Sequence, residues 1–183
     1  LAYHSIENIG IILMGVGLGL LGRSLGSRAI ERLGIAAGLL HVWNHALFKA
    51  LLFLAAGSVM HATGCGELER QGGLARRLPG TALLFGVGAV AICALPPLNG
   101  FVSEWLLYLG LLRALAGQGG TPGLTAVAAI AALALVGGLA AACFLKAFGA
   151  VFLGEPRTPA AAAAREAPRS MLGPMAVLAL CCA

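Results

Sequence analysis

Two histidines and a lysine stand four residues apart in the middle of a long apolar run, at His41, His45 and Lys49. Residues at i, i+4 and i+8 share one face of a helix, and each step rises about 6 Å. A neutral imidazole can donate and accept a hydrogen at once, and the charge of a buried lysine responds to its neighbours. The spacing therefore predicts a ladder along which protons could move through intervening water.

The run around this ladder, from Leu33 to Met60, carries no full charge other than Lys49. A stretch of roughly 20 apolar residues can cross a bilayer, where each ionisable group costs about 2.5–3.5 kcal/mol on insertion scales. Such groups usually mark an ion or proton path, although polar groups also hold helices together. Three aligned groups favour the path. A metal site at the histidines is disfavoured, because the sequence places no thiol or carboxylate beside them.

The composition predicts an all-α integral membrane protein. The chain has 183 residues, of which 60% are hydrophobic and 10% charged, and it has no aspartate, whereas a soluble domain is about 25% charged. The apolar runs are too long for strands and lack the alternation of an outer-membrane barrel. Because every backbone group in lipid must be satisfied internally, helices remain. The expected fold is a polytopic transmembrane helix bundle with one proline-broken helix.

The apolar runs predict five spans within one transmembrane domain over residues 1–183. The expected spans are residues 1–22, 33–63, 81–115, 124–153 and 171–183, the last one truncated. The expected connections are a basic connector at 22–32, a polar loop at 64–79, a turn at 116–123 and a second connector at 154–170. The chain starts at Leu1 inside an apolar run and stops inside another, so we expect a fragment of a longer polytopic protein.

The third span contains the sequence LPPLNG and should break at residues 96–99, near the middle of the membrane. Prolines cannot donate backbone hydrogen bonds, and their rings clash with the preceding turn. A break of this kind is tolerated where the freed groups are buried in protein or line a water-filled cavity, and transporters place ion sites there. Glu104 follows the break by four residues. We interpret it as a proton-accepting carboxylate; the alternative is a surface residue paired with an arginine.

Two further ionisable residues remain open to either interpretation. Glu7 forms a polar patch with His4 and Asn8, and the patch could face the helix that carries Lys49. Glu7 could equally lie at the membrane surface. Lys146 could belong to the proton path, or it could extend its amine to the interface from near the end of its span.

Several functional classes are disfavoured. The glycines from Gly17 to Gly22 match G-x-G-x-x-G, but the dinucleotide motif needs a preceding strand and a later acidic residue. Gly15 and Gly19 are instead expected to allow close helix packing. The five cysteines show no C-x-x-C spacing, so neither a metal site nor a disulfide framework is expected. The net charge of +5 comes mostly from arginines between apolar runs, which is typical of membrane loops rather than nucleic-acid binding. No cofactor is expected.

The chain resembles the proton-conducting membrane transporter family in four stretches that together cover nearly its whole length. They are LAYHSIENIGIIL, HVWNHALFKALLFLAAGSVMHATG, LERQGGLARRLPGT and LPPLNGFVSEWLLY. This family contains the antiporter-like subunits of respiratory complex I, the Mrp cation/proton antiporter subunits and membrane subunits of group 4 hydrogenases. The SIENIG stretch is most similar to the branch of hydrogenase 4 and formate hydrogenlyase.

The resemblance implies roles for particular residues. His41, His45 and Lys49 match the family's buried central axis, where histidines and a lysine relay protons. Glu104 falls where relatives carry lysine or glutamate in the second discontinuous helix. The family's first discontinuous helix, with its own lysine and partner glutamate, would lie before Leu1. Relatives often have a basic residue at the position of Lys146, to which no step is assigned.

The resemblance implies a proton-translocating subunit of a redox-driven complex in the bacterial inner membrane, with several membrane passes. The redox chemistry would belong to peripheral subunits, so the chain would be no oxidoreductase by itself. The implied partners are other membrane subunits, peripheral hydrogenase subunits and lipid, without nucleic acid. One alternative is a Mrp-type sodium/proton antiporter subunit. Another is a structural membrane anchor of a hydrogenase, in which the ladder serves assembly alone.

Overall fold

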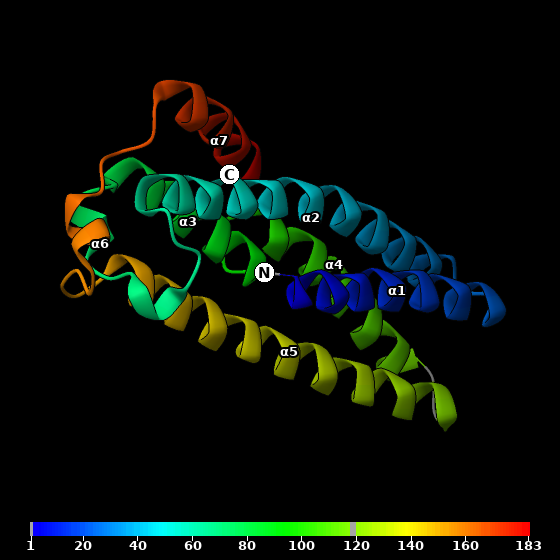
Figure 1. Ribbon diagram of the computed structural model, residues 1–183. Coiled ribbons are helices and arrows are strands. Elements are labelled where there is room, and N and C mark those ends of the chain that lie inside the picture. The colour runs from blue at the N-terminus through cyan, green and yellow to red at the C-terminus, as the bar shows by residue number, and fades with distance from the viewer. Residues whose placement is uncertain (1, 118–119) are drawn as a thin grey trace. The chain divides into compact units, whose positions relative to one another are not determined.

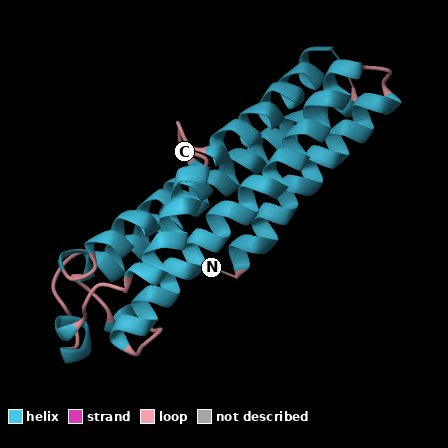
Figure 2. Ribbon diagram, turned by 90° about the horizontal axis from the view of Figure 1, so that it is seen from above, coloured by secondary structure: helices cyan, strands magenta, loops and turns pink. Residues whose placement is uncertain are grey.

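The computed structural model describes residues 2–117 and 120–183, and every regular element in this part of the chain is helical. Six long helices are α1 (Tyr3–Ser24), α2 (Arg28–Thr63), α3 (Pro79–Ile92), α4 (Asn99–Gly117), α5 (Thr121–Phe152) and α7 (Arg169–Cys182) (Figure 1). The short elements are η1 (Leu68–Arg70), η2 (Leu74–Arg76) and α6 (Pro159–Ala163). Loops join these helices (Figure 2). The all-α fold class is confirmed.

Three of the described helices, α1, α2 and α5, are long and apolar enough to cross a membrane. Large apolar side chains are exposed on all three. On α2, for example, Leu39 is 64% exposed and Trp43 is 66% exposed, whereas His41 between them is 2% exposed. A soluble helix would reverse this pattern, because water favours a polar outer face. The distribution fits helices that present an apolar surface to lipid.

The helices differ from the expected spans chiefly at the first connection. α2 begins at Arg28, so only residues 25–27 separate it from α1, whereas the sequence predicted a connector over residues 22–32. Arginines end an apolar run without ending a helix, since they have high helix propensity. Residue 1 of the first expected span and residues 118–119 of the expected turn lie outside the described residues.

The chain divides into two compact units. The first contains Leu1–Ala46 and Ala94–Ala140, and the second contains Leu47–Cys93 and Ala141–Ala183. The long helices α2 and α5 therefore supply residues to both units.

In the first unit, glycines bring α1 directly against α2. A Cβ added to Gly15 would stand 2.8 Å from the Cα of Gly38, and Gly19 and Gly34 face each other as closely. Real side chains do not fit at such separations, so the two backbones themselves are in contact. The close packing predicted for Gly15 and Gly19 is confirmed, and it draws the polar side chains of both helices within hydrogen-bonding reach.

The apolar core of the first unit is built by α1, α2, α4 and α5 together. Its buried members are Ile11, Leu18, Ile30, Ala37, Leu107, Leu111, Ala114, Ala126 and Leu133. Packing of these side chains holds α4 beside α1 and α2, and thereby fixes the position of the polar residues on its first two turns.

The helical interruption covers residues 93–98, between α3, which ends at Ile92, and α4, which begins at Asn99. It therefore starts three residues before the predicted break at 96–99, and Asn99 already belongs to the next helix. Ala94 takes a φ of 50°, a left-handed conformation that few residues other than glycine adopt. The prolines that follow supply no backbone donors. α4 therefore starts anew at Asn99, which places Glu104 in its second turn.

In the second unit, aromatic packing joins α3 to α5, and a carboxylate binds the start of α3. Phe85 of α3 packs against Phe152 of α5, with ring centroids 5.3 Å apart. Pro79 occupies the first turn of α3, where its missing N–H costs no intrahelical hydrogen bond. Glu166, which precedes α7, accepts hydrogen bonds from the backbone N–H of Gly80 at 2.6 Å and from Thr81 Oγ1 at 2.7 Å. An anion at this helix start is also favoured by the helix dipole.

Candidate functional site

His41 is the centre of a buried polar cluster in the first unit, where α1, α2 and α4 meet. Its ring nitrogen Nε2 lies 3.0 Å from Oδ1 of Asn8 on α1, and Nδ1 lies 2.9 Å from Oγ of Ser103 on α4. The imidazole and both of these partners are no more than 2% exposed. The histidine thus bridges three helices through side chains that are almost wholly withdrawn from the surface.

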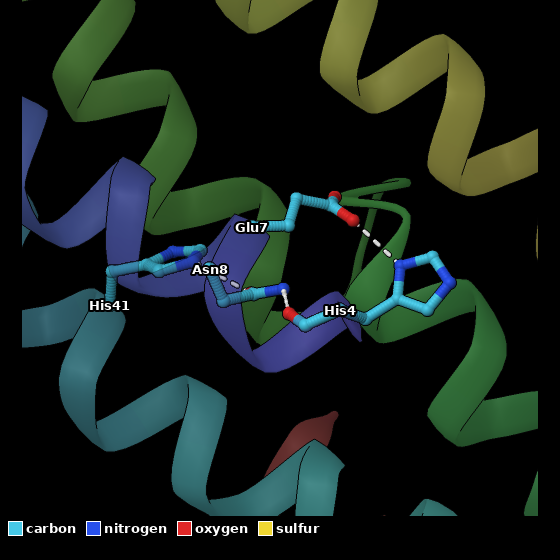
Figure 3. A network of polar contacts seen from close by, with 4 residues as sticks. All are labelled: His4, Glu7, Asn8 and His41. Carbon is cyan, nitrogen blue, oxygen red and sulfur yellow. Dashed lines mark hydrogen bonds and ion pairs between the residues drawn. The ribbon is translucent and has the colours of Figure 1, made fainter. Parts of the chain in front are cut away.

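The α1 side of the cluster continues from Asn8 to two ionisable residues. Nδ2 of Asn8 donates to the backbone carbonyl of His4 at 2.7 Å. Nδ1 of His4 in turn donates to Oε2 of Glu7 at 2.6 Å. Figure 3 shows the resulting series from His41 through Asn8 to His4 and Glu7. Asn8 of this patch contacts α2 through His41, whereas Glu7 interacts with His4 on its own helix and with Glu104 on α4.

The α4 side is held by a second amide. Nδ2 of Asn44, one turn after His41 on α2, donates to the carbonyl of Asn99 at 2.7 Å and to Oγ of Ser103 at 3.1 Å. Ser103 Oγ also lies 3.0 Å from the carbonyl of Gly100. These bonds tie the first turn of α4 to α2 and explain why α4 can begin at Asn99 immediately after a proline-rich interruption.

Glu104 is buried beside this cluster, with 8% of the residue exposed. It interacts electrostatically with Glu7 of α1 and with Tyr108 one turn further along α4. His45 is half-buried and interacts electrostatically with His41. Four residues selected from the sequence therefore belong to the first unit, where His41 interacts with His45 and Glu7 interacts with Glu104.

The two selected lysines belong to the second unit. Lys49 lies on α2 and is 7% exposed, and its Nζ stands 5.6 Å from the centroid of the Phe53 ring. An ammonium over an aromatic face is stabilised electrostatically. Lys146 lies on α5 and is exposed, which fits the interfacial interpretation better than a buried proton path.

Sequence reasoning missed two members of the cluster, Asn44 and Ser103. The sequence position of each residue could have indicated its role. Asn44 is three residues after His41, so it shares its helix face, and Ser103 directly precedes Glu104 after the proline break. Uncharged polar residues are common in membrane helices, and their importance here comes from the packing of α4 on α2. In the described part of the chain, no three His, Cys, Asp or Glu residues are grouped to hold a metal ion.

Comparison with known proteins matches residues 1–128 to the family described as NADH:quinone oxidoreductase/Mrp antiporter, transmembrane. Formate hydrogenlyase subunit 3 of Escherichia coli is 43% identical over 182 residues, which are 100% of this chain and 30% of that protein. Hydrogenase-4 component B of the same organism is 41% identical over 182 residues, 100% of this chain and 27% of that protein. The chain thus spans less than a third of the length of these relatives.

The fold is also found in a solved membrane assembly. The Mrp complex from Dietzia sp. DQ12-45-1b superposes with a TM-score of 0.79 at 24% identity, covering 99% of this chain and 38% of the matched chain. At that identity the likeness establishes the fold alone. The match over residues 1–128 shows that the chain belongs to the NADH:quinone oxidoreductase/Mrp antiporter transmembrane family.

Proposed function

We propose that this chain is part of a proton-translocating membrane subunit of a redox-driven complex of the group 4 hydrogenase or formate hydrogenlyase type. The observation that carries the proposal is the placement of His41. It is 2% exposed and lies between side chains of α1 and α4, on a helix whose outer residues are apolar. Ionisable groups held in this way inside membrane helices are typical of ion and proton pathways.

Protons would pass along His41, His45, Lys49 and Glu104, and charge would couple one step to the next. Neighbouring rungs on one helix are about 6 Å apart. At an effective dielectric constant near 20, a unit charge at that distance is worth about 3 kcal/mol, or about a hundredfold in proton affinity. A proton gained by one ionisable residue is therefore enough to change the protonation of the next residue along the helix.

Water would complete the path at the start of α4. Both polar atoms of the Asn99 side chain are buried and have no hydrogen-bond partner among the residues that the structure describes. Buried amides are almost always satisfied by protein groups or by ordered water. We therefore expect a water molecule here, close to Ser103 and to the carboxylate of Glu104.

The proposal extends to location and partners. The subunit would cross the bacterial inner membrane several times and assemble with other membrane subunits and with peripheral oxidoreductase subunits that hold the metal centres. Its two relatives from Escherichia coli are named as a subunit and a component of such hydrogenase systems. Lipid would contact the exposed apolar side chains of α1, α2 and α5.

A second candidate is a Mrp-type sodium/proton antiporter subunit. The matched family includes Mrp antiporters, and a Mrp complex shares the fold. Both candidates use the same buried groups and differ in whether transport needs sodium. A structural anchor remains the candidate from another class, and it requires no proton movement at all.

One experiment separates the three functions. The full-length subunit is purified in its complex and sealed into liposomes, the complex is driven by its own electron donor and acceptor, and a pH-sensitive dye reports proton movement. Lys49→Ala should abolish the signal while the complex stays assembled. Arg76→Ala is the control, because it removes one exposed cation from the same unit.

The outcomes differ clearly. Unchanged proton movement in an assembled Lys49→Ala complex would favour the anchor. Wild-type transport that stops when sodium is replaced by potassium would favour the antiporter. Sodium-independent transport that is lost in Lys49→Ala supports the proposal.

A further inference from the structure

The partners of Asn8 fix which nitrogen of His41 carries a hydrogen. A backbone carbonyl can only accept, so the atom of Asn8 that lies 2.7 Å from the His4 carbonyl must be Nδ2. Oδ1 of the same amide is then the atom that faces His41 Nε2 at 3.0 Å. Because an amide oxygen also only accepts, Nε2 of His41 must be an N–H donor.

The other nitrogen, Nδ1, is therefore where His41 changes its charge. An imidazole with hydrogen on Nε2 is neutral while Nδ1 is bare and becomes a cation when Nδ1 is protonated. Nδ1 lies 2.9 Å from Oγ of Ser103. A protonated amide oxygen is not a stable species in water, so a proton cannot pass onward from Nε2 through Asn8.

Ser103 can satisfy both charge states of this histidine. Its hydroxyl has one hydrogen and can accept two. Asn44 Nδ2 donates to it at 3.1 Å, and the direction is fixed because the same nitrogen donates to the Asn99 carbonyl. The single hydroxyl hydrogen then has two acceptors in reach, the bare Nδ1 of His41 and the carbonyl of Gly100 at 3.0 Å.

We propose that His41 gains and loses its proton only through Nδ1, with the Ser103 hydroxyl as a two-position hydrogen-bond switch and Asn8 as the residue that closes the Nε2 side. A hydronium ion gives its excess proton to Oγ and is left as water, and the hydrogen that the hydroxyl already held moves onto Nδ1. The imidazolium then donates to Oγ, and the remaining hydroxyl hydrogen points to Gly100. Release reverses these moves, so no atom is gained or lost by the serine.

This inference rests on the proposed function and changes the role that the function gives to His41. His41 would not conduct protons through its ring. Its ring would gain and lose a proton at Nδ1 alone, and the resulting change of charge would act on neighbouring ionisable groups electrostatically. Ser103 and Asn8 are positioning residues in this scheme. Of the titratable groups around the histidine, His45 on α2 interacts with it directly. The others are His4 and Glu7 on α1 and Glu104 and Tyr108 on α4, the two helices that the histidine bridges to α2.

Nitrogen NMR on the wild-type complex tests the tautomer without any change of sequence near the site. The full-length subunit is labelled with ¹⁵N-histidine, and the His41 signals are assigned by their loss in His41→Gln. Neutral His41 should show a protonated Nε2 and a bare Nδ1, and acid should convert only Nδ1. A neutral ring with its hydrogen on Nδ1 would overturn the inference.

The pH profile of proton transport tests Ser103. Ser103→Ala removes a charge-assisted bond from the imidazolium and a weaker one from the neutral ring, so the midpoint should move toward acid by about one unit. Ser103→Thr keeps the hydroxyl and should keep the wild-type profile. The control is Ser58→Ala, since Ser58 is equally buried but donates to the sulfur of Met175.

The results separate this inference from the proposed function. An active His41→Gln complex would contradict the proposed function itself. An inactive His41→Gln complex together with a wild-type pH profile in Ser103→Ala would overturn the switch and leave the proposed function standing. Comparing each variant with wild type removes the contribution of the other titratable groups, which are the same in both.

Discussion

The two units use polar side chains for different purposes. In the first unit, buried side chains bind other buried side chains, as His41 does with Asn8 and Ser103. In the second unit, Gln71 donates to the Cys65 carbonyl at 2.8 Å and Glu166 accepts from the Gly80 N–H, so these side chains bind the backbone of a loop and of a helix start. The comparison separates polar groups that can exchange a proton from polar groups that hold the chain in place.

Lys49 is the exception in the second unit. It is buried and ionisable, and its ammonium faces the Phe53 ring. Lys146, the other lysine of this unit, is exposed. The same residue type is therefore buried at one position of the second unit and exposed at another. Burial of an ionisable side chain within the helices marks the residues that we assign to proton transfer.

Among the glutamates, the largest effect should come from removing the carboxylate of Glu104 in the first unit. Glu104→Gln keeps the size of the side chain but cannot release a proton, and transport should fall about a hundredfold, as for loss of a positioned proton-transfer group. Dye-reported transport in liposomes measures this. Glu155→Gln is the control, because its carboxylate is exposed and pairs with an exposed arginine, Arg76, at 3.8 Å. Equal losses in both variants would contradict the comparison.

A smaller effect is expected at Glu7, which acts on Glu104 through its charge. Glu7→Gln should reduce transport by about tenfold, since a coupling of 1–2 kcal/mol is typical of charges in contact networks. The double variant with Glu104→Gln should lose little beyond Glu104→Gln alone. If the two losses simply multiply, the carboxylates do not act together.

The second unit should respond in stability rather than in transport. Glu166→Gln weakens the bonds that this carboxylate accepts at the start of α3, at a cost of about 1–2 kcal/mol. The temperature at which the purified complex loses its monodisperse profile in detergent should fall. Transport per assembled complex should stay at the wild-type value. Lost transport in well-assembled complex would place Glu166 among the transfer residues.

The smallest effect is expected at Lys146. Because this side chain is exposed on α5, Lys146→Ala should leave both transport and assembly within experimental error of wild type. The same liposome assay gives the answer. A clear loss of transport would show that burial is a poor guide to function in the second unit.

The sequence predicts the helical fold, and it singles out the ionisable residues that we propose for proton transfer more readily than the uncharged residues that contact His41. His41, Lys49 and Glu104 are recognisable because ionisable groups are rare in apolar runs. The prolines likewise predict a helix break without any structure. Ser103 and Asn44 were missed, because a hydroxyl or an amide costs little in a membrane helix and gains its importance only when another helix places an imidazole beside it.

The start of α2 shows a second limit of sequence reasoning. Polarity predicted a connector over residues 22–32, whereas the helix already runs from Arg28. Hydropathy reports where lipid ends, and backbone hydrogen bonding decides where a helix ends. The close approach of α1 and α2 was predictable from Gly15 and Gly19, but which polar residues it would bring together depends on the rotation of both helices.

The most direct test compares two histidines of one helix. His41 is buried between α1 and α4, whereas His61 lies exposed near the end of α2. Proton transport by the reconstituted complex should fall about a hundredfold in His41→Gln, as expected for a proton-transfer group, and should be unchanged in His61→Gln. Wild-type transport by a fully assembled His41→Gln complex would contradict the central role of the buried imidazole.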